Sequence, residues 1–286
     1  MYEAPEHPPV LESELSIRKT LKDSWGLSTK YFNALVIPFL IISIPNLCLW
    51  LSRKEETSFG ILTIMLPPIA IMGIHRSLFL LKSEGKHPTL RQTFEQGNEY
   101  WGRGFKLDLV KFLYMIPLLV LIICFMTPSF RVVDKNSAIW AIYFLSGLTI
   151  SVIAFYLFLA RTCIAPAAMA DKKLGAFEAF RLAWTLTKGK TSKITLLVAT
   201  VSAIFVFVLI PIIFLFGGVL GILLCALLGI KSDFSESHIL WIPIILLFWF
   251  IFGFYITYLH ISYNIIYQKL RPIEQNSDKE SLPIKI

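Results

Sequence analysis

The sequence predicts an all-α polytopic membrane protein with six transmembrane helices, and composition gives the first two observations behind that fold class. Apolar residues make up 56% of the chain and charged residues only 16%, whereas a soluble domain carries about 25% charged residues. Mean hydropathy is +0.67. The apolar residues are also gathered into runs of the length that a helix needs to cross a bilayer, about 20 residues. These runs do not alternate between apolar and polar residues, so a membrane β-barrel is a poor alternative.

The third observation is a pattern that occurs three times along the chain: an amphipathic stretch that ends in tryptophan, followed by two long apolar runs. The three stretches are 16–25, 90–101 and 177–184. A Phe-Glu pair stands seven residues before both Trp101 and Trp184, and this shared register supports a repeat. We therefore predict three repeated units, each an amphipathic helix plus a helical hairpin, around a pseudo-threefold centre.

The apolar runs place the six spans and the segments that flank them. The predicted spans are 33–52, 59–82, 108–127, 137–162, 194–216 and 239–267. Together with the amphipathic stretches they form a membrane domain over 16–268. The Pro- and Glu-rich segment 1–15 is expected to be disordered, and 269–286 is expected to be a tail.

The fifth apolar run, 194–230, is too long for one simple span. A continuous helix of that length would reach about 55 Å, against about 30 Å of hydrocarbon. Pro211 and the pair Gly217-Gly218 offer a break. We expect the span to end near 216 and the following apolar piece to lie at the interface or to be re-entrant. Its inclusion in the span remains open.

The net charge of +8 is distributed unevenly about the predicted spans. On the predicted internal side lie 22 of the 27 Lys and Arg residues, a bias that indicates cytoplasmic loops. Both termini are therefore expected to be cytoplasmic, and a nucleic-acid partner is not expected.

Motifs for chemistry are missing from the sequence. Cys48, Cys124, Cys163 and Cys225 have no close spacing, which argues against a disulfide framework or a CxxC site. Two of the five histidines lie within spans, without a second ligand at helical spacing, so we expect no metal and no cofactor. Hydrolase, metalloprotease and nucleotide-binding signatures are absent, and we expect a protein that is not an enzyme.

Three ionisable residues near the cytoplasmic ends of spans are the candidate contacts for an anionic ligand or lipid: His75, Arg76 and Arg161. Arg76 stands 25 residues before Trp101 and Arg161 stands 23 before Trp184, which suggests equivalent positions. Charge inside a membrane is costly and points to function by default. The structural alternative is that both arginines snorkel, or bond the carbonyl ends of neighbouring helices.

Trp25, Trp101 and Trp184 are the expected interfacial anchors, because tryptophan gathers at membrane–water interfaces. Nearby Lys and Arg residues would add attraction to anionic lipid, about 1 kcal/mol per cation. Membrane lipids are therefore the expected partners, with a membrane protein partner as a further option.

One stretch resembles a known family. It contains Ile164-Ala165-Pro166-Ala167-Ala168, then Asp171 and Gly175, then Ala179-Phe180 and Ala183 to Lys190. This pattern is similar to that of bacterial inner-membrane proteins related to the membrane domain of glycerophosphoryl diester phosphodiesterase. The resemblance is clearest over 160–200 and implies six spans in the bacterial inner membrane. It carries over no phosphodiesterase activity, because the chain has no catalytic domain.

These observations lead to an expected function. We expect a non-enzymatic integral membrane protein with a role in envelope or lipid homeostasis, which binds lipid or a partner protein. The alternative is a transporter of an anionic or amphiphilic small molecule, favoured by the repeat, the long fifth run and the two arginines.

Overall fold

The computed structural model describes residues 15–45, 47, 66–131, 138–228 and 238–271. In the described residues the secondary structure is helical and contains no strand, which confirms the all-α fold class. The helices are α1 (Ile17–Lys30), α2 (Phe32–Ile42), α5 (Pro67–Glu84), α6 (Leu90–Arg131), α7 (Ala138–Thr162), α8 (Ala165–Lys172), α9 (Ala176–Leu186), α10 (Thr191–Ile204), the π-helical turn η1 (Phe205–Leu209), α11 (Ile210–Leu227) and α12 (His238–Leu270).

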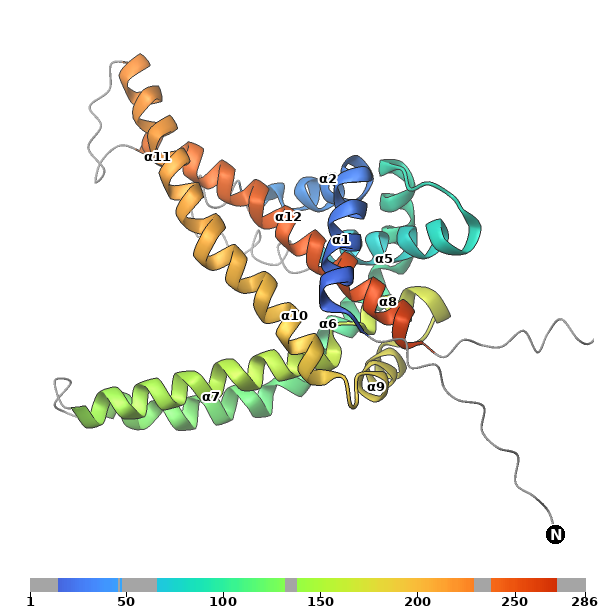
Figure 1. Cartoon of the computed structure of the whole chain (residues 1–286), viewed down its shortest axis with the longest axis horizontal. Coiled ribbons are helices and arrows are strands. Elements are labelled where there is room, and N and C mark those ends of the chain that lie inside the picture. Colours follow the sequence, from blue (N-terminus) through green and yellow to red (C-terminus); the bar gives the residue numbers. More distant parts are fainter. Residues whose placement is uncertain (1–14, 46, 48–65, 132–137, 229–237, 272–286) are drawn as a thin grey trace, which may run out of the picture.

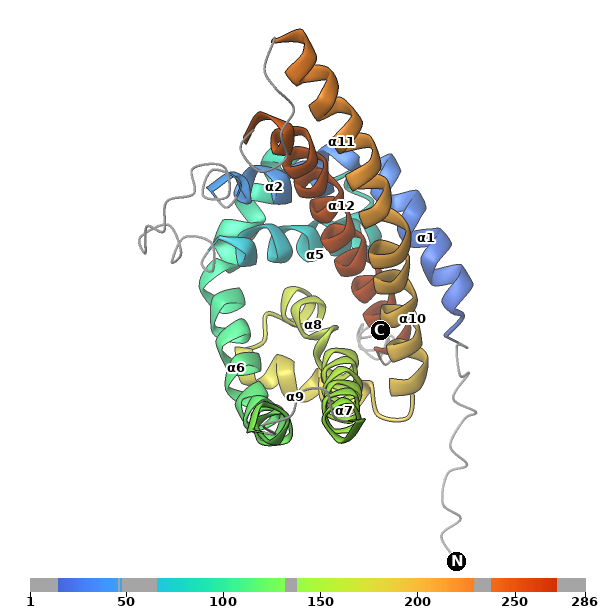
Figure 2. The same cartoon turned by 90° about the vertical axis from the view of Figure 1, so that its left-hand side faces the viewer.

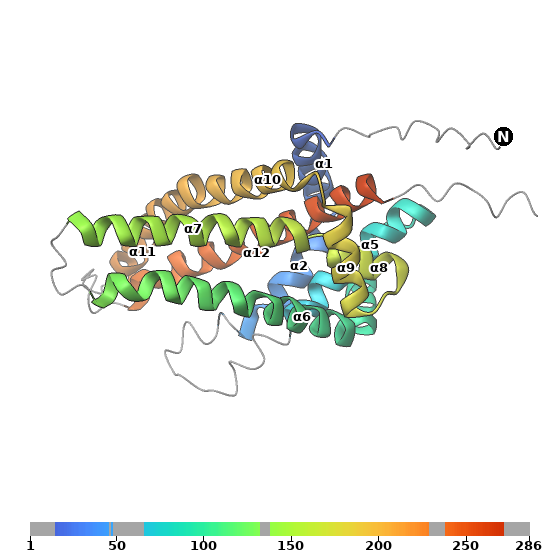
Figure 3. The same cartoon turned by 90° about the horizontal axis from the view of Figure 1, so that it is seen from below.

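Two long hairpins diverge from a compact helical base (Figure 1). One consists of α6 and α7, and the other consists of α10, η1, α11 and α12. Figure 3 shows that both extend from the same side of the base. In Figure 2, α8 and α9 lie at the base between α6 and α12.

The described helices have the length and composition of a membrane protein. Three stretches are long and apolar enough to cross a bilayer: 144–172, 191–227 and 241–270. A fourth results if α1 and α2, which meet at 81°, count as one broken span. At most 28% of the residues in each of the three apolar windows are buried in the protein, so most of their side chains are free to face lipid.

The count of six spans and the domain limits remain predictions. Parts of the first two predicted spans lie outside the described residues, at 46, 48–52 and 59–65, as does the first residue of the fourth. The expected disordered segment, apart from Leu15, also lies outside them, as does the tail beyond Arg271. Leu15 itself is buried, with 3% of its surface exposed.

The fifth run does not break where the sequence suggested. The helix continues from Thr191 to Leu227, past the expected end at 216. Its π-helical turn explains how proline is accommodated: the amide of Ile210 donates to the carbonyl of Phe205, five residues back. Pro211 follows directly, and the widened turn relieves the clash that its ring makes in a regular helix.

The second unit also differs from its expected form. Its amphipathic stretch and its first span are a single 42-residue helix, α6. In the predicted third unit, the amphipathic stretch and the first span are two helices, α9 and α10, separated at Gly189, whose φ is +82°. Glycine adopts this left-handed conformation without the strain of a side chain.

Glycines set the closest helix contacts. A Cβ atom added to Gly73 of α5 would collide with the carbonyl oxygen of Thr93, and one added to Gly97 of α6 would collide with that of Ile69. In the second hairpin, a Cβ atom on Gly217 would lie 2.8 Å from Cα of Ile244 in α12. Small residues thus let neighbouring backbones approach one another.

Helix α8 forms the centre of the base. Its residues from Ala165 to Ala170 are buried, and it contacts α5, α6, α9 and α12. The small alanine side chains allow this close approach from four directions. Asp171, at its end, accepts hydrogen bonds from the hydroxyl of Tyr267 at 2.7 Å and from Nη1 of Arg271 at 2.9 Å. These contacts tie α8 to the end of α12.

Helix α1 packs against α12 through a stripe of small hydroxyl residues. Thr20, Ser24 and Ser28 have no exposed surface, and each donates to the carbonyl four residues earlier. Ser262 of α12 donates to Ser24 at 2.8 Å, and the hydroxyl of Tyr258 donates to the carbonyl of Leu21 at 2.9 Å. The fully buried residues of α1 are therefore polar, while Ile17 and Leu21 are partly buried against the core and Trp25 meets Phe254 of α12 edge to face.

Candidate ligand-binding cleft

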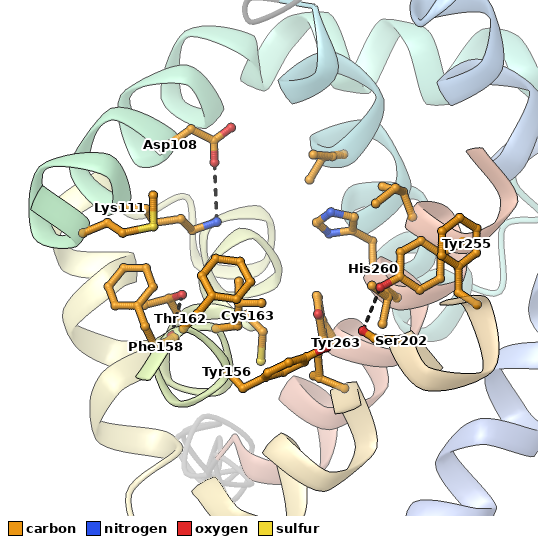
Figure 4. Close-up of a pocket in the computed structure, with 18 of the residues that line it drawn as sticks. Asp108, Lys111, Tyr156, Phe158, Thr162, Cys163, Ser202, Tyr255, His260 and Tyr263 are labelled. Carbon is orange, nitrogen blue, oxygen red and sulfur yellow. Dashed lines mark hydrogen bonds and ion pairs between the residues drawn. The ribbon is translucent and has the colours of Figure 1, made fainter. Parts of the chain in front are cut away.

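A cavity of about 700 Å³ lies where the two hairpins meet the base. Its walls come from α6 and α7 on one side and from α10, η1 and α12 on the other, and Figure 4 shows the side chains that line it. We call this cavity the cleft. Its two walls belong to different hairpins, so its shape depends on how the two hairpins pack together.

Most of the cleft surface is apolar. The walls are formed mainly by large aliphatic and aromatic side chains, among them Phe112, Met115, Phe155, Leu159, Phe205 and Leu259. Farther along the hairpins the side chains remain apolar and become exposed, as at Phe207 and Leu215. An apolar path therefore leads from the cleft onto the outer surface of the hairpins.

Polar groups gather at one end of the cleft. Asp108 and Lys111 enter it from α6, and His260 and Tyr263 enter it from α12 (Figure 4). Nζ of Lys111 lies 3.5 Å from Oδ1 of Asp108, longer than the 2.7–2.9 Å of a tight charge-assisted hydrogen bond. The lysine ammonium thus retains donors for a ligand in the cleft.

A second histidine stands behind His260, away from the cleft. Nε2 of His75 lies 3.1 Å from Nδ1 of His260, and the two rings meet edge to face. Nδ2 of Asn264 lies 3.2 Å from Nδ1 of His75, and Nε2 of Gln268 donates to Oδ1 of Asn264 at 2.6 Å. A continuous polar network therefore connects the cleft to the end of α12.

The π-helical turn forms part of the cleft wall. Phe205 stacks on the ring of Tyr255, with the ring centroids 4.3 Å apart. The hydroxyls of Ser202 and Tyr255 are hydrogen-bonded at 2.8 Å, so both are satisfied beside the cavity. Turns of this kind are frequent at functional sites.

The two arginines proposed from the sequence do not line this cleft. Nη1 of Arg76 donates to the carbonyl of Ala170 at 3.1 Å, and Nη1 of Arg161 donates to the carbonyl of Trp184 at 3.2 Å. Each guanidinium also lies over an aromatic ring, that of Phe79 for Arg76 and that of Trp184 for Arg161. These contacts match the structural alternative, carbonyl bonding, and a ligand role for the two arginines remains a prediction.

His75, the third predicted contact, is fully buried and reaches the cleft only through His260. The predicted anchors differ in exposure. Trp25 is 58% exposed and Trp184 is 45% exposed, whereas Trp101 is partly buried and stacks on Phe105. The role of these tryptophans at an interface remains a prediction.

Two smaller cavities accompany the cleft. One, of about 220 Å³, lies beside Trp25 between α1, α12 and the helix that contains η1. The other, of about 450 Å³, lies beside Trp184 between α6 and α9 and includes Arg181. The first has an almost entirely apolar lining, whereas the second also includes the hydroxyl residue Thr185. Among the described residues no three metal-ligating side chains cluster.

The sequence alone did not identify Lys111 or Asn264 as site residues. One signal was present: His260, Asn264 and Gln268 follow one another at intervals of four in an otherwise apolar run, which places them on one face of a helix. No comparable signal links this face to Lys111, because that pairing depends on how separate hairpins pack.

Comparison with known proteins gives one match. A family model described as "Protein of unknown function (DUF4013)" matches residues 59–225, more than half of the chain. No curated protein and no solved structure matches the chain. The predicted link to the membrane domain of glycerophosphoryl diester phosphodiesterase remains a prediction.

Proposed function

Because the chain belongs to the DUF4013 family, whose description assigns no activity, we propose its function from the geometry of the cleft. The proposal is a non-enzymatic membrane protein that binds a membrane amphiphile, with a role in lipid or envelope homeostasis. One observation carries it: the cleft has a polar end and long apolar walls that continue onto the exposed hairpins. Such a division matches a ligand with a polar head and hydrocarbon chains.

The charge bias of the sequence supports a position of the ligand's head group at the cytoplasmic side of the membrane. Lys111 lies near the start of the predicted span 108–127 and His260 near the end of 239–267. Both positions are at cytoplasmic ends if the positive-inside bias sets the orientation. We therefore propose that the head group enters from the cytoplasmic leaflet of a bacterial inner membrane, with both termini of the protein cytoplasmic.

Native mass spectrometry of the protein extracted from its own membrane, with lipid analysis of what co-purifies, tests this function. We expect one class of amphiphile to be enriched over its share of the membrane. Lys111→Ala should lower its retention about tenfold or more, since a hydrogen bond to a charged group contributes about 1.5–3 kcal/mol.

Lys106→Ala is the matched control, because it removes the same charge from the same helix at an exposed position outside the cleft. Retention should then be unchanged. If the unmodified protein, Lys111→Ala and Lys106→Ala all retain lipids in the proportions of the parent membrane, the proposal is contradicted and binding of a partner protein is favoured.

Transport of the amphiphile is the second candidate function, favoured by the π-helical turn in the cleft wall. Pro211→Ala restores the backbone donor that proline lacks and so permits a regular helix there. If the turn has to change shape during transport, this variant should slow the movement of a fluorescent lipid across reconstituted vesicles and leave lipid retention unchanged. Equal rates with the variant, the unmodified protein and empty vesicles would contradict transport.

A further inference from the structure

The hydrogen bonds behind the cleft fix which of its groups are donors. Asn264 is buried, and its Nδ2 atom lies 3.3 Å from the carbonyl oxygen of His75 as well as 3.2 Å from Nδ1 of the same residue. A carbonyl oxygen only accepts hydrogen bonds, so the NH₂ end of the amide must face it. The backbone of α5 thereby fixes the orientation of the Asn264 side chain.

This orientation determines the protonated nitrogen of each neutral histidine. Nδ1 of His75 accepts from Asn264, so the hydrogen of its ring is on Nε2. That hydrogen is donated to Nδ1 of His260, 3.1 Å away. The ring hydrogen of His260 must then be on Nε2. No described residue accepts from this atom, and Figure 4 shows the imidazole directed into the cleft.

The other polar groups at this end of the cleft are also mainly donors. The ammonium of Lys111 has three N–H groups and no acceptor. The hydroxyl of Tyr263 has no partner among the described residues and is able to donate. Among the described residues that line the cleft, Asp108 alone carries a carboxylate; its side chain is 47% exposed and lies 3.5 Å from Nζ of Lys111.

We propose that the amphiphile has an anionic oxygen head group, such as a carboxylate or a phosphate ester, and that Asn264 and His75 select it by holding His260 as a donor. This inference rests on the proposed function. Asn264 and His75 are positioning residues, since neither lines the cleft. A head group that presents only donors would meet N–H groups and be rejected, because unpaired buried polar groups are costly.

The first test determines which ring nitrogen of each histidine carries the hydrogen in the unmodified protein, and it needs no ligand. ¹⁵N NMR of protein labelled at its five histidines distinguishes the two neutral tautomers, and His260→Gln and His75→Gln identify the signals. We expect hydrogen on Nε2 in both rings. Hydrogen on Nδ1 of His260 would overturn the inference.

The second test compares two probes that differ only in the head group, oleate and oleyl alcohol, by their displacement of bound lipid. We expect the unmodified protein to prefer oleate by about tenfold or more, the contribution of a hydrogen bond to a charged group. Asn264→Leu removes the donor to His75, so the preference should fall by several-fold.

Gln268→Leu serves as the control, because it removes a hydrogen bond of the same network and leaves the contact of Asn264 with the His75 carbonyl in place. Its preference should match that of the unmodified protein. Equal affinities for oleate and oleyl alcohol would overturn the inference and leave the proposed function standing. Failure of both probes to displace any lipid, with phosphatidylglycerol also inactive, would instead contradict the proposed function.

Discussion

Gly97→Ala is expected to destabilise the protein by about 3 kcal/mol, the upper part of the range for overpacking a dense contact. The added methyl group would collide with the backbone carbonyl oxygen of Ile69 and would also lie 3.1 Å from Cγ2 of that residue. A backbone oxygen cannot swing aside as a side chain does, so α5 and α6 would have to separate. Thermal unfolding in detergent should show a midpoint lower by about 10 °C.

Gly102 provides the control for this change, five residues farther along the same helix. A Cβ atom added there meets nothing within 4 Å. Alanine is the better helix former by about 1 kcal/mol, so Gly102→Ala should leave the midpoint unchanged or raise it. A similar fall with both variants would contradict the role that we assign to the contact of Gly97 with α5.

Asp171→Ala should lower the stability by about 2–3 kcal/mol. The carboxylate is 8% exposed and accepts from both Tyr267 and Arg271. Its removal leaves the guanidinium of Arg271 without its carboxylate, and loss of one partner of a buried pair costs about 3–5 kcal/mol. We expect the smaller loss, about 2–3 kcal/mol, because Arg271 is 34% exposed and water partly replaces its lost partner. We expect α12 to lose its attachment to α8, measured as a lower midpoint of thermal unfolding.

Glu95→Ala removes a carboxylate from a pair of similar length on the surface. Oε1 of Glu95 lies 2.7 Å from Nε of Arg91, and the two side chains are 57% and 88% exposed. Water screens such pairs, so the unfolding midpoint should not change. An equal loss of stability in the two variants would contradict the importance that we assign to burial at Asp171.

The long apolar runs predicted much of the fold because the need to satisfy backbone hydrogen bonds in lipid leaves helices as the main solution. They could not predict that the helix from Thr191 would continue past Gly217 and Gly218 to Leu227. Nor could they predict the π-helical turn before Pro211, because composition does not encode a local widening of the helix. The apolar runs also did not predict the polar contacts of α1 with α12, where Ser24 bonds Ser262 and Thr20 bonds Lys269.

The candidate site was less accessible to sequence reasoning than the fold. Arg76 and Arg161 were predicted as ligand contacts because they are charges near span ends. In the structure both donate to backbone carbonyls of helices that follow later in the chain. Lys111 and His260 line the same cleft although they are more than a hundred residues apart in the sequence and lie on different hairpins. Only their packing brings the two side chains to one cavity.

The attachment of α1 to α12 has a consequence for biosynthesis. The hydroxyl stripe of α1 leaves the ribosome first, whereas Tyr258 and Ser262, which complete its contacts, are translated more than two hundred residues later. Helix α1 therefore has no native partner in α12 while the intervening segments insert into the membrane. Its docking is a late step of assembly, and a nascent chain interrupted before α12 would expose the stripe to the quality-control machinery of the cell.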